Sequence, residues 1–135
     1  MGMIFNRGAQ GLLDGTITWT SATIKARLSR TSENAISKDA TTMTGLGLSA
    51  TDLTFGSKTG PTEDQSTDRI KFDCGDPTFA AVAAGAEVDK IIVFKFVTND
   101  AGSTPIAVVS ITPITPNGGD IVVTIDAAGL FYLQQ

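Results

Sequence analysis

Histidine is absent from the chain, and cysteine occurs once, as Cys74. Histidine is the commonest general base and metal ligand, and it completes the usual serine and cysteine triads. Its absence removes the most frequent forms of acid–base, nucleophilic and metal-dependent catalysis, so we expect no enzymatic activity and no cofactor. A single cysteine cannot form an internal disulfide, and the fold therefore does not depend on an oxidising compartment. Without a histidine partner, Cys74 is interpreted as a small buried apolar residue.

Charged residues are also scarce, at 18% of 135 residues, and the formal net charge is −4. Binding to nucleic-acid phosphates requires clustered lysine and arginine. The one basic cluster, formed by Lys25, Arg27 and Arg30, is predicted to lie on the solvated face of a strand. We therefore expect no nucleic-acid partner. A polar but weakly charged surface suits packing against other proteins.

Long apolar runs are missing as well. No stretch approaches the ~20 apolar residues that a membrane helix needs. Residues 1–13 lack the sustained apolar core of a signal peptide. These features predict no membrane partner and folding in a cytoplasm.

The most apolar segment, residues 89–97, is rich in β-branched and aromatic residues, which fit a pleated sheet. Alternation places Ile92, Phe94 and Phe96 on one face and Ile91 and Val93 on the other. A strand at the edge of a sheet alternates apolar with polar residues, whereas this one is apolar on both sides. The pattern predicts a strand in the middle of a sheet, covered on both faces.

Alternating apolar and polar residues predict further strands at several places along the chain. They are residues 16–20, 23–29, 51–55, 69–73, 106–111, 121–125 and 130–133. Residues 56–67 are predicted to form a polar loop or hairpin tip, and residues 79–86 favour an extended segment over a helix. Asn117-Gly118 is the strongest turn signal, because this pair readily supplies positive φ.

The spacing of apolar residues between residues 4 and 14 indicates a short helix or arm. We therefore predict an all-β fold, a single antiparallel, jelly-roll-like β-sandwich preceded by a short N-terminal helix or arm. The boundaries are residues 1–15 for the arm or helix and residues 16–135 for the sandwich domain.

Two weaker chemical possibilities remain open. Asp73 and Asp76 could hold a calcium ion, although the surrounding sequence lacks the repeated Asp and Asn of a calcium loop. The alternative is that these aspartates accept backbone N–H bonds in turns. Trp19 and Tyr132 could stack on a sugar, but Trp19 shares a face with Ile17, which favours core packing.

Several segments together resemble a family of small virion structural proteins of tailed bacteriophages, most closely those that decorate the head. The segments are residues 12–19, 23–28, 70–73, 76–79, 91–95, 116–121 and 126–131. Residues 30–66 depart from the family's pattern. The resemblance implies a cement-like protein on the capsid exterior, assembled in the host cytoplasm, with the major capsid protein and sister copies as partners. A neck or tail component and a carbohydrate- or receptor-binding sandwich are the alternatives.

A sandwich presents rigid faces, so neighbours are expected to be reached by its loops and termini. Two segments qualify, residues 1–13 and the polar stretch 30–44. Both contain apolar residues without an obvious place in a sandwich core, and they are expected to be mobile in the free protein. The predicted interface residues are Ile4, Phe5, Arg7, Ile36 and Met43. Copies could cluster as trimers, but the sequence does not fix their number.

Overall fold

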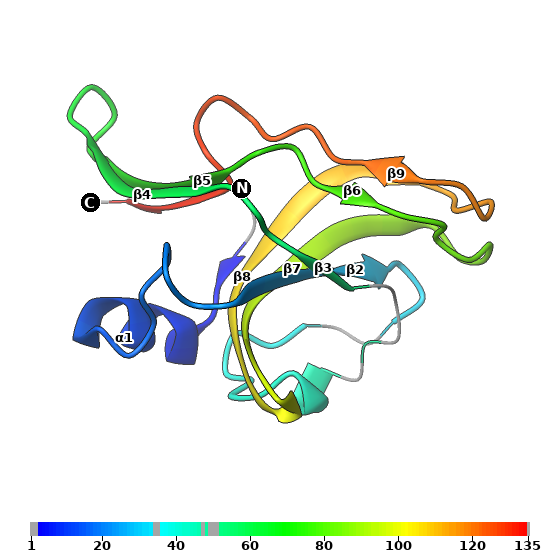
Figure 1. The fold of residues 1–135 in the computed structure, drawn as a ribbon, viewed down its shortest axis with the longest axis horizontal. Helices are drawn as coiled ribbons and strands as arrows, with labels where there is room; N and C mark the ends of the chain where they lie inside the picture. Colours follow the sequence, from blue (N-terminus) through cyan, green and yellow to red (C-terminus); the bar gives the residue numbers. More distant parts are fainter. Residues whose placement is uncertain (1–2, 34–35, 47, 49–51, 135) are drawn as a thin grey trace.

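The computed structural model describes residues 3–33, 36–46, 48 and 52–134. Antiparallel strands dominate this part of the chain, and one short α-helix precedes most of them (Figure 1). The elements are β1 (Met3–Ile4), α1 (Asn6–Asp14), β2 (Ile24–Arg30), the 3-10 helix η1 (Thr44–Leu46), β3 (Asp52–Thr54), β4 (Lys58–Asp64), β5 (Arg69–Cys74), β6 (Thr78–Phe79), β7 (Val88–Val97), β8 (Asn99–Ile114), β9 (Ile121–Val122) and β10 (Phe131–Gln134). The predicted all-β, antiparallel, sandwich-like fold with a short N-terminal helix is confirmed.

A five-stranded sheet with the order β1-β8-β7-β2-β3 forms the middle of the molecule. The strand predicted to be central, β7, is the third of the five. The small sheets β10-β5-β4 and β6-β9 lie over one face of this sheet, and the described residues of segment 31–46 lie on the other (Figure 1). Both faces of β7 are therefore covered by other parts of the chain.

Two separate hydrophobic clusters occupy the two faces. The upper cluster contains Ile91 and Val93 of β7 together with Trp19 and the stacked rings of Phe72 and Phe131. The lower cluster contains Ile92 and Phe94 of β7, packed with Phe5, Met43, Leu46, Leu48 and Val108. Successive residues of one strand thus enter different cores, as the alternation predicted.

Glycines in and after the N-terminal helix allow it to pack closely against β8 and to end at residue 15. A Cβ atom on Gly8 would lie 2.5 Å from the Ile106 Cα and 2.6 Å from the Pro105 carbonyl oxygen. Only glycine lets the helix backbone approach β8 this closely. Gly15 ends the helix with a φ of 83°, a conformation that glycine adopts without a Cβ clash.

Residues 16–20 are not a strand, which corrects the prediction. The Thr16 amide donates to the Asp14 carboxylate over 2.9 Å, and the Ala22 amide donates to the Thr18 carbonyl over 2.8 Å. These local bonds form turns and take the place of a strand ladder. Ile17 and Trp19 are nevertheless buried, as expected.

Several strand boundaries also differ from the predictions. The segment expected to be a polar loop, residues 56–67, contains β4, which pairs with β5. Of the predicted strand 121–125, only Ile121–Val122 pairs, with β6. Residues 79–86 contain no helix, but only Phe79 lies in a strand, and turns and bends follow it, so the predicted extended segment is not formed beyond its first residue. The turn at residues 117–120 is present, and Gly118 has a φ of 94°.

The face of β2 predicted to be solvated is instead buried. Arg27 is 7% exposed and Ser29 is 1% exposed. The prediction assumed that one face of β2 is exposed to solvent, because its polar residues alternate with apolar ones. In the structure the described residues of segment 31–46 cover this face of the sheet, so Arg27 and Ser29 are buried and Lys25 is half-buried.

Replacing Phe94 by alanine should destabilise the protein by about 3–5 kcal/mol, because the ring is fully buried and its removal leaves a cavity. Urea unfolding of the wild type and the variant measures the difference. Leu13→Ala is the matched control, since Leu13 is 77% exposed and its truncation should change stability by less than about 0.5 kcal/mol. A loss below ~1 kcal/mol for Phe94→Ala would mean that the lower cluster contributes little to stability.

Candidate functional site

Two of the five predicted interface residues lie inside the domain. Phe5 and Met43 are both 0% exposed and belong to the lower cluster. The premise that they have no place in the core is wrong, because the sheet has a second core that the sandwich pattern did not include. The Met43 amide also donates to the Ser103 carbonyl over 3.0 Å, which attaches this part of the long polar segment to β8.

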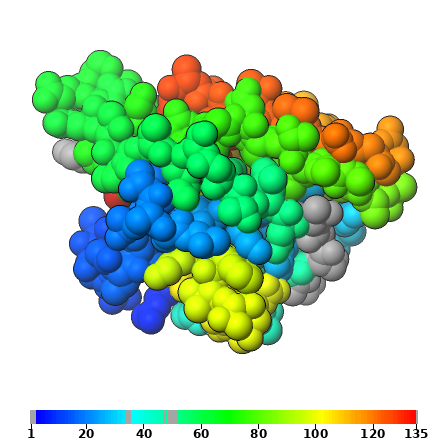
Figure 2. All heavy atoms as spheres, viewed as in Figure 1, coloured from blue at the N-terminus to red at the C-terminus, as the bar shows by residue number. Residues whose placement is uncertain are grey.

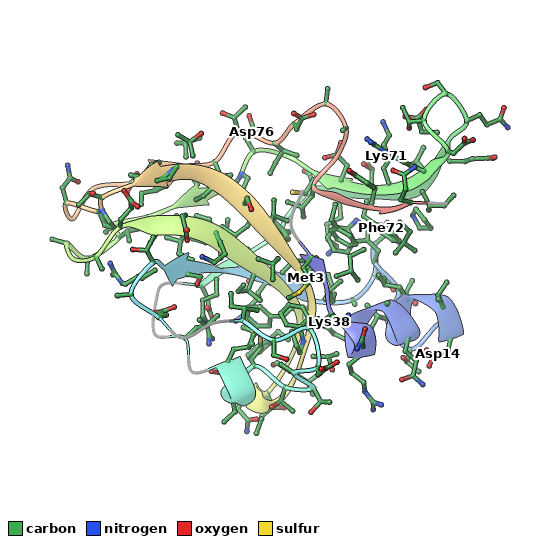
Figure 3. The ribbon with its side chains drawn as sticks, turned by 180° about the vertical axis from the view of Figure 1, so that it is seen from behind. Met3, Asp14, Lys38, Lys71, Phe72 and Asp76 are labelled. Carbon is green, nitrogen blue, oxygen red and sulfur yellow. The ribbon has the colours of Figure 1, made fainter. Side chains whose placement is uncertain are left out.

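The other three predicted residues retain surface. Arg7 is exposed on α1, and Ile4 and Ile36 are half-buried. The start of α1 is joined to the polar segment by two hydrogen bonds. The Asn6 amide donates to the Lys38 carbonyl over 3.0 Å, and its side-chain amide donates to the Asp39 carboxylate over 2.7 Å. We call the surface formed by Met3, Arg7, Ile36 and Lys38 the N-terminal surface; Figure 3 shows Met3 and Lys38 near each other.

An ion cluster around the buried Arg27 lies on the lower face of the five-stranded sheet, where the sequence predicted a solvated cation. Arg27 donates two hydrogen bonds to Asp100, at 2.8 and 2.9 Å, and also forms an ion pair with Asp52. These bonds raise the pKa of the arginine further and lower that of the Asp100 carboxyl below its usual value. The cluster joins β2 to β3 and to the start of β8, so its role is structural.

A groove of about 560 Å³ lies on the side of the molecule where β8, the segment after β9 and β10 meet. Its lining mixes apolar side chains with hydroxyl groups. Representative lining residues are Val109, Ser110, Ile114, Val122, Leu130 and Tyr132. Val122 is 58% exposed and Ile114 is 36% exposed, and they are two of the four large apolar residues that the described chain exposes. Exposed apolar residues beside a groove are typical of an interaction site.

One side of this groove is formed by β8. β1 pairs with β8 only at Ala107 and Val108. Beyond Val108, no strand in the described residues pairs with β8 on that side. Strand alternation did not reveal the groove, because it does not show which distant segments come to lie beside β8.

The residues considered for chemistry are engaged in the fold. Trp19 is 2% exposed, and its indole N–H donates to the carbonyls of Thr59 and Asp73. Asp73 and Asp76 accept the backbone amides of Cys74 and Ile125, both over 2.8 Å; the Asp73 bond is local, whereas the Asp76 bond joins two segments that are distant in the chain. Tyr132 is half-buried, and the Arg69 guanidinium lies 4.0 Å from its ring centre.

Within the described ranges, no three His, Cys, Asp or Glu side chains are grouped closely enough to share a metal ion. No helix in this part of the chain is long and apolar enough to cross a membrane. The chain matches no protein-family profile, no curated protein and no solved structure.

Burial raises the pKa of the Cys74 thiol to about 12, and the nearby carboxylates of Asp73 and Asp76 add to this effect. At pH 8 the folded protein should therefore react with iodoacetamide far more slowly than the urea-unfolded protein, because little thiolate is present. Intact-mass measurement follows the alkylation. Cys74→Ala should fold and keep its binding activity with a modest change in stability. Rapid alkylation of the folded protein would contradict the structural interpretation of this residue.

The stabilisation from the Arg27–Asp100 pair should depend on pH. The folded-state pKa of Asp100 lies below its unfolded value of about 3.9, so the stabilisation is present above that value and is lost as pH falls through the folded pKa. The urea midpoints of wild type and Asp100→Asn should differ most at neutral pH and converge once the pH lies below the lowered folded-state pKa of Asp100. A difference that stays constant between these limits would show that the carboxylate charge does not contribute.

Proposed function

We propose that this protein is a non-enzymatic structural component of a tailed-phage virion, a decoration protein that binds the assembled head and stabilises contacts between capsid subunits. The sequence resemblance in residues 12–19, 23–28, 70–73, 76–79, 91–95, 116–121 and 126–131 suggests this function. The observation that carries it is the contrast between the interior and the surface. The candidate groups for chemistry are used in the fold, while several large apolar side chains remain accessible beside a groove.

A decoration protein needs a rigid body and exposed contact surfaces, and it needs no catalytic group. The two clusters on either side of β7 supply rigidity. The N-terminal surface and the groove supply contacts on separate parts of the molecule. A protein that binds only the assembled shell stabilises it by mass action, and many copies in a lattice add their effects.

The proposed location is the capsid exterior, with the major capsid protein and sister copies, possible trimers, as partners. A neck or tail component would use the same kind of surfaces. A carbohydrate-binding role has less support, since Trp19 is buried and one face of the Tyr132 ring is covered by Arg69.

Imaging of virions with a count of copies distinguishes these locations. A decoration protein should cover the whole head in a regular lattice. The same virions without this protein should release DNA at a lower temperature. Density confined to the neck or the tail tip would reject the decoration role.

The N-terminal surface should contact the head, and point variants test this better than truncation. Deleting residues 1–7 would remove Phe5, which is fully buried, so the deletion variant should lose stability rather than retain a folded domain as the arm hypothesis predicts. Arg7→Glu and Ile36→Ser change exposed or half-buried side chains and should preserve the fold. Each should weaken binding to expanded heads by about tenfold, through lost steering or lost apolar contact.

Lys71→Glu is the charge-matched control. Lys71 lies on β5, well away from Met3 and Lys38 (Figure 3), and its reversal should leave head binding unchanged. Co-sedimentation with expanded heads over a range of protein concentrations measures all three variants. Wild-type affinity in both Arg7→Glu and Ile36→Ser would show that attachment uses another surface.

A further inference from the structure

Lys95 is the one charged residue in the otherwise apolar run 91–97 of β7. The residue is half-buried, and its Nζ donates to the Thr16 carbonyl over 2.8 Å. An ammonium group carries three N–H donors, so two remain available for another acceptor. In the described part of the chain, no carboxylate forms an ion pair with Lys95. The strand therefore places a positive charge with spare donors where the connection after α1 meets the sheet.

A pocket of about 300 Å³ lies at this lysine, between α1 and the strands β7 and β8. Figure 2 shows α1 and the chain after it, in blue, beside the end of β7 and the start of β8, in yellow. β1 pairs with β8 at Ala107 and Val108, and neither residue lines the pocket. The polar residues of the lining are Arg7, Gln10, Asp14, Thr16, Lys95 and Thr104.

Hydrogen-bond donors dominate this lining. Thr104 lies opposite Lys95 in the β7–β8 ladder, which places the two side chains on the same face of the sheet. Arg7 and Gln10 are exposed and lie about one turn apart on α1, so they share a face of the helix. Arg7 forms no ion pair with a carboxylate among the described residues. A guanidinium, a carboxamide, an ammonium and a hydroxyl thus line one small space. Such a set suits a carboxylate, which only accepts hydrogen bonds.

Asp14 also lines the pocket, and the fold already satisfies its carboxylate. The hydroxyl and the amide of Thr16 donate to it over 2.7 and 2.9 Å. These bonds hold the pKa of Asp14 below its usual value, and the charge of Arg7 adds to the effect. With the two cations Arg7 and Lys95 and the one anion Asp14, the lining carries a single net positive charge, in a chain whose formal net charge is −4. The pocket therefore matches a ligand with one negative charge better than a phosphate group, which carries about −1.5 to −2 at pH 7.

We propose that this pocket binds the carboxylate side chain of an aspartate or glutamate on a partner protein, held between Arg7 and Lys95. The proposal rests on the proposed function only in placing that side chain on the major capsid protein. Arg7 also belongs to the N-terminal surface, so one partner would fill the pocket and contact Ile36. A single exposed ion pair binds weakly. Repetition over a lattice of copies makes many such contacts effective.

The first test follows the amide signals of the full chain by NMR during titration with the blocked tripeptide acetyl-Gly-Glu-Gly-amide at constant ionic strength. The Gly11, Gly102 and Thr104 amides, which belong to the lining, should shift and saturate with a Kd of about 10 mM or tighter. The matched neutral peptide acetyl-Gly-Gln-Gly-amide should produce no saturable shift, because it lacks the charge.

Variants assign the charge to the pocket. Arg7→Gln changes an exposed side chain, so it should fold normally and weaken binding of the glutamate peptide about fivefold. Lys95→Gln should weaken it as well, although this variant also loses the bond to Thr16. Lys71→Gln is the matched control, since Lys71 is a half-buried lysine on β5 and does not line the pocket, and it should bind like wild type.

The second test uses expanded heads and a carbodiimide, which joins an amine to a carboxylate in direct contact with loss of water. Mass spectrometry of the digested complex should find Lys95 linked to an acidic residue of the major capsid protein. Lys71 should form no such link. Arg7→Gln should lower the yield of the Lys95 link, because the carboxylate is then held less firmly.

Equal binding of the two tripeptides, or wild-type affinity in both Arg7→Gln and Lys95→Gln, would overturn the carboxylate site. Tighter binding of inorganic phosphate than of the glutamate peptide would overturn it in favour of a phosphate-bearing ligand. A Lys95 link to a sister copy would overturn the assignment to the capsid protein. Binding of the glutamate peptide by a protein that does not bind heads would reject the proposed function and support the site. Head binding with neither peptide binding nor a Lys95 link would reject the site and leave the proposed function intact.

Discussion

The structure depends on one constraint: a strand that is apolar on both faces must be covered on both faces. Ile91 and Val93 of β7 enter one core, and Ile92 and Phe94 enter the other. Leaving either set in water would forfeit about 1.5–3 kcal/mol for each large side chain. A single sandwich interface covers only one face of a sheet. The chain therefore needs a second covering layer, and the polar segment after β2 provides it together with Phe5.

The second layer explains the charges found inside the molecule. Arg27 lies on the same side of β2 that this layer covers, so its guanidinium loses most of its water. Such a charge is tolerated only with close partners of opposite sign. Asp52 comes from β3 and Asp100 from the start of β8, and together they occupy both sides of the guanidinium. The ion cluster is thus a consequence of the layering, and it fixes the positions of segments far apart in the sequence.

The separation of interior and surface also shapes the functional proposal. Hydrogen bonds inside the fold engage the indole of Trp19 and the carboxylates of Asp73 and Asp76. The accessible features are of another kind, namely apolar side chains beside a groove and an arginine without a carboxylate partner among the described residues. These features recognise a polypeptide better than a small molecule, because a polypeptide presents both backbone groups and alternating side chains. Two surfaces on separate parts of one rigid body would allow the protein to link neighbouring subunits.

The sequence by itself determined the β class, the central position of β7, the N-terminal helix and the turn at Asn117-Gly118, because strand period, apolar content and turn chemistry act locally. It could not determine the second core, since Phe5 and Met43 lie far apart in the chain and meet only after the sheet has formed. It misplaced Arg27 for the same reason: an alternating strand looks half-solvated until a distant segment covers its polar face. The groove between β8 and the segment after β9 was likewise decided by tertiary structure, because its lining residues come from segments far apart in the chain. Alternation fixes which side chains share a face, but only the assembled sheet fixes which distant segments lie beside them.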